Sequence, residues 1–136
     1  MDNSLKLEPQ DIRKYWDEIK PGLEDIKATW PELSTWRVED VYAAVVAEEA
    51  ILYVKEEGFA VCTLETDEFS GKTDLSIWIA YSYGTEKHMI QKYLTSFIEV
   101  AKRLGCSGVS TRSNHPALAK ALEPTYVKYR VPVDGS

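Results

Sequence analysis

The sequence has 136 residues, 44% of them hydrophobic and 11% aromatic, and this composition favours a folded domain with a hydrophobic core over a disordered chain. No apolar run approaches the roughly 18 residues that a membrane span requires. The first ten residues contain neither the basic nor the apolar stretch of a secretory signal. We therefore expect one domain, residues 1–136, in the cytoplasm and without a membrane partner.

Charge and cysteine content narrow the class of ligand. The net charge of −6 disfavours nucleic acid as a partner, because nucleic-acid binders usually carry a basic surface. Residues 1–70 contain 17 acidic and 7 basic side chains, whereas residues 71–136 contain 5 and 9. An anionic ligand would prefer the second half, although such a split is also ordinary surface variation. Cys62 and Cys106 lack metal-like spacing and are expected to be buried thiols.

The first quarter of the chain predicts a short strand and a helix. Residues 5–8 alternate before Pro9, as a first strand does. Residues 9–26 have the apolar spacing of one helical face. The pair Pro21-Gly22 predicts that this helix stops there or bends into a second short helix.

A loop and a second helix follow. Residues 29–36 read as a loop, with Ser34 or Thr35 available as the helix cap. The apolar positions of the second helix fall on one face, and they are Val38, Val41, Tyr42, Val45 and Val46.

Three consecutive strands are predicted next, at about residues 51–55, 59–65 and 73–82. Period-two alternation places one set of side chains on a single face of the third strand, and the set is Leu75, Ile77, Ile79 and Tyr81. Trp78 is then expected on the opposite face.

The third strand leads directly into a long helix that ends at Gly105, the residue expected just beyond a helix C-terminus. Its apolar stripe consists of Ile90, Leu94, Phe97, Ala101 and Leu104. A strand at 107–111, a helix at 114–123 and a strand at 125–133 complete the chain. This order predicts an α/β fold: a mixed, mostly antiparallel central sheet of about six strands, with helices on both faces.

This order resembles the GNAT superfamily, the Gcn5-related N-acetyltransferases. The stretch "LKLEPQDIRKYWDEI" is similar to the family's first strand, turn and helix, and "FIEVAKRLGCSGVSTRSNHPALAKAL" is similar to its central segment. The phrase "WRVEDVYAAVVAEEAILYV" resembles small GNAT-like proteins of tailed bacteriophages, which would place the chain in the host cytoplasm or with the virion. The resemblance implies acetyl transfer from acetyl-CoA to an amine. It also implies that the third strand of the run splays from its neighbour to admit the cofactor.

The family's diagnostic loop, Arg/Gln-x-x-Gly-x-Gly/Ala, holds the coenzyme A pyrophosphate against a helix N-terminus, where backbone N–H groups form an anion site. The corresponding stretch here, "AYSYGTEKHM", departs from that pattern, because it has a single glycine and no Arg or Gln. Glu86 adds a negative charge there, and Lys87 offsets part of it. The cofactor-binding residues that the resemblance implies are Ala80, Tyr81, Ser82, Tyr83, Gly84, Thr85, Lys87 and Asn114.

The catalytic residues are less defined. Asn114 matches the family's Asn after the fifth strand, but Ala121 occupies the position of the Tyr that protonates the leaving thiolate. Tyr126 is the remaining candidate for this donor, with a packing role as the alternative. The acidic residues near the central strands are expected to be solvated turn residues, so no general base is assigned; they are Glu65, Asp67, Glu68 and Asp74. His88 and His115 lack a third ligand, so no metal site is expected.

Two further features concern partners. The loop at 29–36 contains Trp30 and Trp36, which form either an aromatic wall for the acceptor or the filling beneath a loop. GNAT domains commonly end in a β-hairpin, whereas here a single strand follows the last helix, so its edge is open to a second copy or another protein. Three interpretations stay open: an N-acyltransferase acting on a small-molecule or protein amine, a catalytically inactive GNAT-like binding or assembly module, and an unrelated α/β domain.

Overall fold

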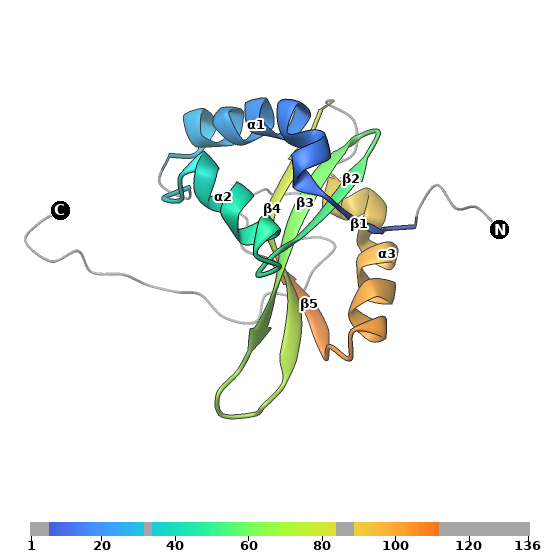
Figure 1. The fold of residues 1–136 in the computed structure, drawn as a ribbon. Coiled ribbons are helices and arrows are strands. Elements are labelled where there is room, and N and C mark those ends of the chain that lie inside the picture. Colours follow the sequence, from blue (N-terminus) through green and yellow to red (C-terminus); the bar gives the residue numbers. More distant parts are fainter. Residues whose placement is uncertain (1–5, 32–33, 84–88, 112–136) are drawn as a thin grey trace, which may run out of the picture.

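The computed structural model describes residues 6–31, 34–83 and 89–111, which form a five-stranded sheet with helices on both faces (Figure 1). The elements are β1 (Pro9–Gln10), α1 (Ile12–Thr29), α2 (Val38–Val46), β2 (Ile51–Lys55), β3 (Gly58–Thr66), β4 (Thr73–Ser82), α3 (Met89–Arg103) and β5 (Gly108–Thr111). The strands lie in chain order, and neighbours are antiparallel except for the parallel pair β4 and β5. The predicted mixed, mostly antiparallel sheet is confirmed. The helix and strand predicted at 114–123 and 125–133 lie outside the described residues.

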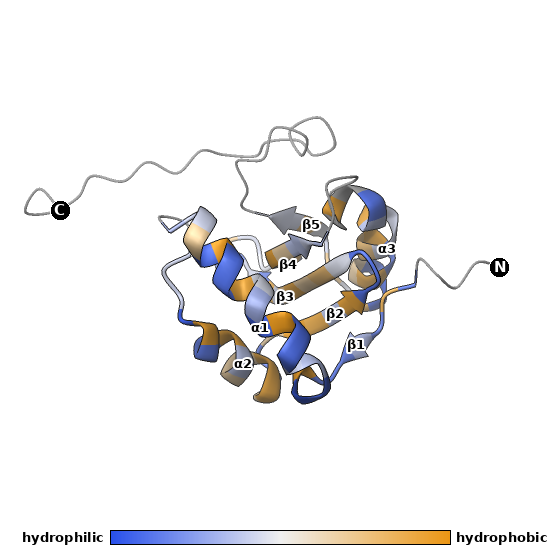
Figure 2. Ribbon diagram, turned by 90° about the horizontal axis from the view of Figure 1, so that it is seen from above, coloured by the Kyte–Doolittle hydropathy of each residue, from blue (hydrophilic) through white to orange (hydrophobic). Residues whose placement is uncertain are grey.

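The sheet separates two hydrophobic cores. Helices α1 and α2 cover one face and α3 covers the other, as the two views in Figures 1 and 2 show. The core under α1 and α2 includes Ile12, Ile19, Leu23, Val41, Leu52, Phe59 and Val61. The core under α3 includes Leu7, Tyr53, Cys62, Leu75, Ile77, Tyr93, Phe97 and Val100. Each helix buries one apolar face against the sheet, so both cores depend on the same strands.

Helix α1 runs without interruption from Ile12 to Thr29, so the prediction that it stops or bends at Pro21 is wrong. Pro21 is exposed, and its missing N–H is tolerated because the helix buries Ile19 and Leu23 completely. Gly22 faces the sheet, where an added Cβ would lie 2.7 Å from Cε1 of Phe59 and 2.9 Å from Cδ2 of Tyr81. Glycine therefore lets α1 approach the aromatic side chains of β3 and β4.

Two boundaries differ from those predicted. The first strand is Pro9–Gln10 rather than residues 5–8. Of the predicted range, residues 6–8 are described, and they are irregular, although Leu7 is buried. Proline, which cannot donate to a ladder, occupies the first position of this edge strand. The cap of α2 is Arg37, not Ser34 or Thr35. The hydroxyl of Ser34 instead donates to the carbonyl oxygen of Trp30 over 2.6 Å.

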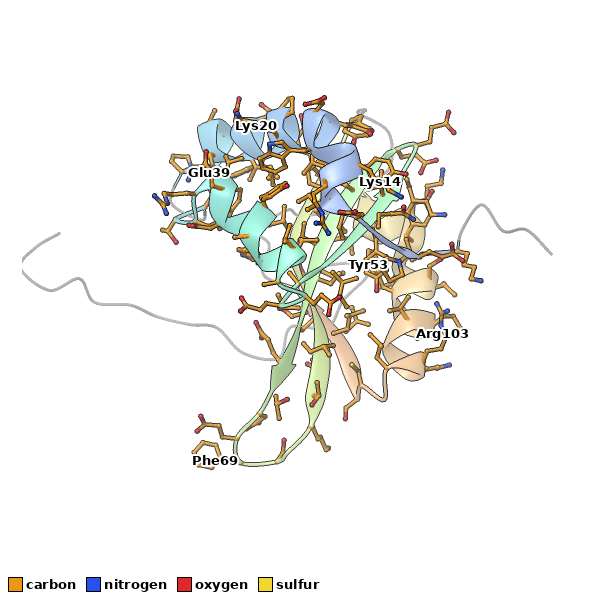
Figure 3. The ribbon with its side chains drawn as sticks, in the orientation of Figure 1. Lys14, Lys20, Glu39, Tyr53, Phe69 and Arg103 are labelled. Carbon is orange, nitrogen blue, oxygen red and sulfur yellow. The ribbon has the colours of Figure 1, made fainter. Side chains whose placement is uncertain are left out.

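Helix α3 matches the predicted stripe at Ile90, Phe97 and Ala101, which are buried, whereas Leu104 is 47% exposed. Tyr93 and Val100 are buried as well, so the buried face is broader than the predicted stripe. Gly105 has a φ of +75°, as expected of the residue after a helix C-terminus. Beyond the sheet, the hairpin joining β3 to β4 projects away from the helices and carries Phe69 at its tip (Figure 3).

Candidate functional site

A β-bulge in β4 interrupts its pairing with β3. Val61 of β3 pairs with Ile79, but the next residue, Cys62, pairs with Ile77, so Trp78 is an extra residue without a partner across the ladder. The bulge reverses the alternation of side chains: Leu75 and Ile77 belong to the core under α3. Ile79 and Trp78 belong to the core under α1 and α2.

The prediction that one face of β4 carries all four alternating residues is therefore wrong, because Tyr81, like Ile79, packs on the α1 side. Trp78 lies opposite Ile77 as predicted, but on the same side as Ile79. A period-two pattern cannot reveal a bulge, since the inserted residue is itself apolar and the sequence continues to alternate after it.

Beyond the bulge, β4 runs on toward α3. Within the described residues, which end at Thr111, β5 pairs with β4 from Asp74–Gly108 to Ile77–Thr111, and β4 continues to Ser82. Helix α3 is described from Met89. The bulge and α3 thus follow each other along a single stretch of chain.

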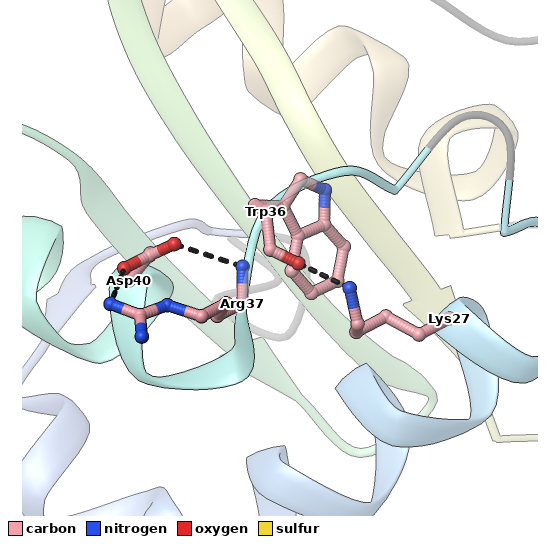
Figure 4. A network of polar contacts seen from close by, with 4 residues as sticks. All are labelled: Lys27, Trp36, Arg37 and Asp40. Carbon is pink, nitrogen blue, oxygen red and sulfur yellow. Dashed lines mark hydrogen bonds and ion pairs between the residues drawn. The ribbon is translucent and has the colours of Figure 1, made fainter. Parts of the chain in front are cut away.

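The loop between α1 and α2 contacts the bulge on the face of the sheet that these two helices cover. The rings of Trp36 and Trp78 meet edge to face with centroids 6.3 Å apart. Lys27 supports this loop: its ammonium donates to the carbonyl oxygens of Ser34, over 2.8 Å, and of Trp36 (Figure 4). Its nitrogen also lies 5.1 Å from the centroid of the Trp36 ring. Trp30, in contrast, is 41% exposed, so of the two loop tryptophans only Trp36 borders the bulge.

The entry to α2 fixes the other side of this loop. Asp40 accepts a hydrogen bond from the backbone N–H of Arg37 over 2.9 Å, and its second oxygen is 3.4 Å from the Arg37 guanidinium (Figure 4). The backbone hydrogen bond from Arg37, more than the guanidinium, lowers the pKa of Asp40. Trp36 therefore lies between a lysine contact on one side and a capped helix on the other.

The end of β4 carries two tyrosines that are held by carboxylates of α1. The hydroxyl of Tyr81 donates to Oδ2 of Asp25 over 2.6 Å, and that of Tyr83 donates to Oε1 of Glu18 over 2.8 Å. The bond to Asp25 is the main cause that raises the pKa of Tyr81. Desolvation, followed by the bond to Glu18, raises the pKa of Tyr83. Both phenols are thus protonated donors at neutral pH, directed toward α1.

Of the predicted cofactor-binding residues, the structure describes Ala80, Tyr81, Ser82 and Tyr83. Ala80 packs against the core under α3, whereas Tyr81 packs on the α1 side, so the two side chains lie on opposite faces of β4. Ser82 is the last residue of β4. The remaining candidates lie outside the described residues; they are Gly84, Thr85, Lys87, Asn114 and Tyr126. The two histidines, His88 and His115, lie outside them as well.

Glu57 is a site residue that the sequence analysis missed. It lies in the turn between β2 and β3, and its carboxylate accepts from the Lys92 ammonium over 2.9 Å and from the hydroxyl of Tyr93. Its backbone carbonyl accepts from the N–H of Tyr83 over 2.9 Å. The sequence carries no signal for this, because Glu57 is one of two adjacent acidic residues in a turn and its partners are more than 25 positions away.

The remaining acidic candidates are away from the bulge, and two of them, Glu65 and Asp74, pair with each other in β3 and β4 rather than lying in a turn as predicted. Glu65 and Glu68 are exposed, at the end of β3 and in the hairpin, and Asp67 accepts from the N–H of Phe69 over 2.9 Å within the same hairpin. Within residues 6–31, 34–83 and 89–111, no group of three or more His, Cys, Asp and Glu side chains is arranged to hold a metal ion. None of the described helices has the length and hydropathy needed to cross a membrane.

The fold has clear counterparts among solved structures. No protein-family model matches the sequence, and a search of curated proteins found no match. A crystal structure of a probable acetyltransferase is similar with a TM-score of 0.69 and 12% identity, over 94% of this chain and 98% of that chain. A possible acetyltransferase from Clostridium difficile 630 gives 0.66 and 17%, over 94% and 97%. A GNAT family acetyltransferase from Staphylococcus aureus subsp. aureus USA300_TCH1516 gives 0.64 and 12%, over 94% and 96%.

These similarities show that the chain has the GNAT fold, which confirms the resemblance at the level of architecture. At such identities they carry no residue-level information about activity.

Proposed function

We propose that the protein is an acyl-CoA-dependent N-acyltransferase that transfers an acetyl group from acetyl-CoA to an amine. The observation that carries the proposal is the path of β4 within a GNAT fold. The strand is bulged at Trp78 and runs on from there to Ser82, before the chain enters α3. A bulge of this kind frees backbone groups in the middle of a sheet, where a ligand can use them.

The described residues fit an extended cofactor in two respects. The extra residue of the bulge, Trp78, has no paired residue in β3, and we assign the thioester carbonyl of the cofactor to its backbone. Helix α3 follows β4 along the chain, and the N-terminal end of a helix suits a pyrophosphate because of the helix dipole. Acetyl-CoA, when bound, supplies a thioester carbonyl that is activated for attack by an amine.

The chain's own residues would shape the acceptor side. Trp36 borders Trp78 on the α1 and α2 face. Tyr81 lies farther along β4 and Tyr83 follows its last residue, and the hydroxyls of both are bound to α1. An amine that enters from this face would meet aromatic rings and carboxylates, which attract a cation. The proposed cofactor contacts at Gly84, Thr85, Lys87 and Asn114, and the proposed proton donor Tyr126, complete the site.

Calorimetric titration with acetyl-CoA and with CoA tests the proposal. We expect micromolar binding, and we expect Gly84→Val to remove it while circular dichroism shows an unchanged fold, since a β-branched side chain blocks close approach of backbone to phosphate. Glu68→Val, which places the same side chain at an exposed position of the distant hairpin, is the control and should leave the affinity within twofold. No binding by the unmodified protein at millimolar ligand would refute the proposal.

One observation favours a second candidate, a binding module without catalysis. Phe69 is 99% exposed at the tip of the projecting hairpin, which is unusual for a phenyl ring on a protein surface. Sedimentation of the protein and of Phe69→Ser tests whether this ring mediates self-association: an oligomer that the substitution dissociates supports the module, and two monomers refute self-association through this ring. The phage origin and the host or virion location remain predictions.

A further inference from the structure

A single residue contacts the chain on both sides of the junction between β4 and α3. The backbone carbonyl of Glu57 accepts from the N–H of Tyr83, just after β4, over 2.9 Å. Its carboxylate accepts from Lys92 over 2.9 Å and from the hydroxyl of Tyr93, both in the first half of α3. Glu57 therefore contacts Tyr83 and also Lys92 and Tyr93, which follow nine and ten positions later, and the junction lies between these contacts.

The turn that contains Glu57 packs closely against the end of β4. The next residue, Gly58, pairs with Ser82, and an added Cβ at Gly58 would lie 2.0 Å from the carbonyl oxygen of Tyr81. No other residue fits there without moving the backbone. The turn between β2 and β3 is thereby held against the end of β4, and the Glu57 carboxylate is brought within reach of α3.

Tyr93 links this contact to the path of the helix. Its side chain is 2% exposed, yet its backbone has φ −106° and ψ 16°, which is non-helical, so α3 kinks at this residue. The ammonium groups of Lys55 and Lys92 each lie 5.7 Å from the centroid of its ring. A buried ring, two cations and a carboxylate thus fix the point at which α3 changes direction.

We propose that Glu57 is a positioning residue for cofactor binding, which sets where the first turns of α3 lie relative to the end of β4. This inference rests on the proposed function. Backbone N–H groups bind a pyrophosphate well only when they are held in place before the ligand arrives, because ordering them on binding costs affinity. Glu57 provides this restraint without touching the cofactor.

The test measures acetyl-CoA affinity in Glu57→Ala, Glu57→Gln and Tyr93→Phe. We expect roughly tenfold weaker binding in Glu57→Ala and Tyr93→Phe, with the double variant no weaker than Glu57→Ala, because the two groups act through one contact. Glu57→Gln should recover part of the affinity, since its amide oxygen still accepts from Tyr93. Glu56→Ala removes the same charge from the neighbouring exposed position and should leave the affinity within twofold.

Amide hydrogen exchange separates failure of this inference from failure of the proposed function. Glu57→Ala, compared with Glu56→Ala, should accelerate exchange in residues 92–96 by about tenfold while β3 and β4 stay protected. If the unmodified protein binds no acetyl-CoA, the proposed function fails and exchange alone decides whether Glu57 positions α3. Unchanged exchange, or wild-type affinity in Glu57→Ala, would overturn the inference, and Glu57→Gln serves if the alanine variant does not fold.

Discussion

At the scale of single residues, Gly22 shows how one missing side chain determines a helix position. The site is buried between α1 and the rings of Phe59 and Tyr81, so a methyl group has no room. Elsewhere in a helix interior, replacing glycine with alanine stabilises by up to about 1 kcal/mol, because alanine restricts the unfolded chain more. At Gly22 the steric term opposes that gain.

We expect Gly22→Ala to lower the free energy of unfolding by about 1–2 kcal/mol, since overpacking costs about 1–3 kcal/mol and the helix propensity returns part of it. Urea unfolding measures the change. Lys20→Ala, two positions earlier and exposed, should stay within about 0.5 kcal/mol of the unmodified protein. A stabilised Gly22→Ala would show that α1 does not approach the sheet this closely.

Glu57 provides a residue-scale prediction for pH. The hydrogen bond from Lys92, and then that from Tyr93, lower the pKa of Glu57 below its ordinary value of 4.5. A carboxyl with a lowered folded-state pKa contributes stability above its unfolded pKa and loses it as the pH falls through the folded value. The contribution is therefore complete at neutral pH and disappears in acid.

Glu57→Gln should be less stable than the unmodified protein by about 1 kcal/mol at pH 7, because this ion pair is partly exposed to solvent. The difference should shrink steadily as the pH falls below 4.5 and disappear once the carboxyl is protonated in the folded protein. Urea titrations at several pH values measure it. A gap between the two proteins that is the same at pH 7 and pH 3 would contradict the assignment of the shift to this carboxylate.

At the scale of elements, the bulge in β4 decides which side chains enter which core. If Trp78 took a regular place in the ladder, Ile79 and Tyr81 would continue on the face of Leu75 and Ile77, and the core under α1 would lose two of its strand contacts. The bulge thereby places the large side chains before it and after it in different cores.

Deletion of Trp78 should leave the side chains in their cores, because Ile77 and Ile79 then become neighbours in a regular ladder opposite Cys62 and Val61. Trp78→Leu keeps the bulge, so both variants should unfold cooperatively, with a stability reduced by the lost contact to Trp36. Thermal unfolding followed by circular dichroism measures both. A deletion variant that loses its cooperative transition while Trp78→Leu keeps it would contradict the assignment of Trp78 as the extra residue.

At the scale of the whole molecule, the two cores share one sheet and should unfold together. The tryptophans at positions 16, 36 and 78 pack against the core under α1 and α2, so their fluorescence reports that side of the sheet. Phe97 is fully buried on the other side, against Tyr53. A cavity at Phe97 therefore tests whether damage under α3 reaches the tryptophans.

We expect Phe97→Ala to lower stability by about 3–5 kcal/mol and to shift the fluorescence and circular dichroism transitions by the same amount, as a two-state domain requires. Ile19→Ala, on the tryptophan side, is the matched control and should also shift both probes together, by about 2–5 kcal/mol. A fluorescence transition that stays at the wild-type midpoint in Phe97→Ala would contradict the expectation of a single domain.

The sequence by itself determined the order of elements, most of their bounds and the fold class. The strands at Ile51–Lys55 and Thr73–Ser82 and the glycine after α3 were predictable, because alternation, helical spacing and the glycine preference at helix ends are local properties of the chain. The GNAT resemblance followed from that order rather than from the diagnostic loop.

Only the tertiary structure decided the bulge at Trp78, the continuity of α1 through Pro21, and the role of Glu57. Each depends on residues distant in sequence: Cys62 and Val61 define the register, the sheet holds α1 through Ile19 and Leu23, and Tyr83 and Tyr93 reach Glu57 from another part of the chain. A local pattern states what a segment prefers. Packing selects among those preferences, because burial and cross-strand pairing contribute more free energy than the propensity of any one residue.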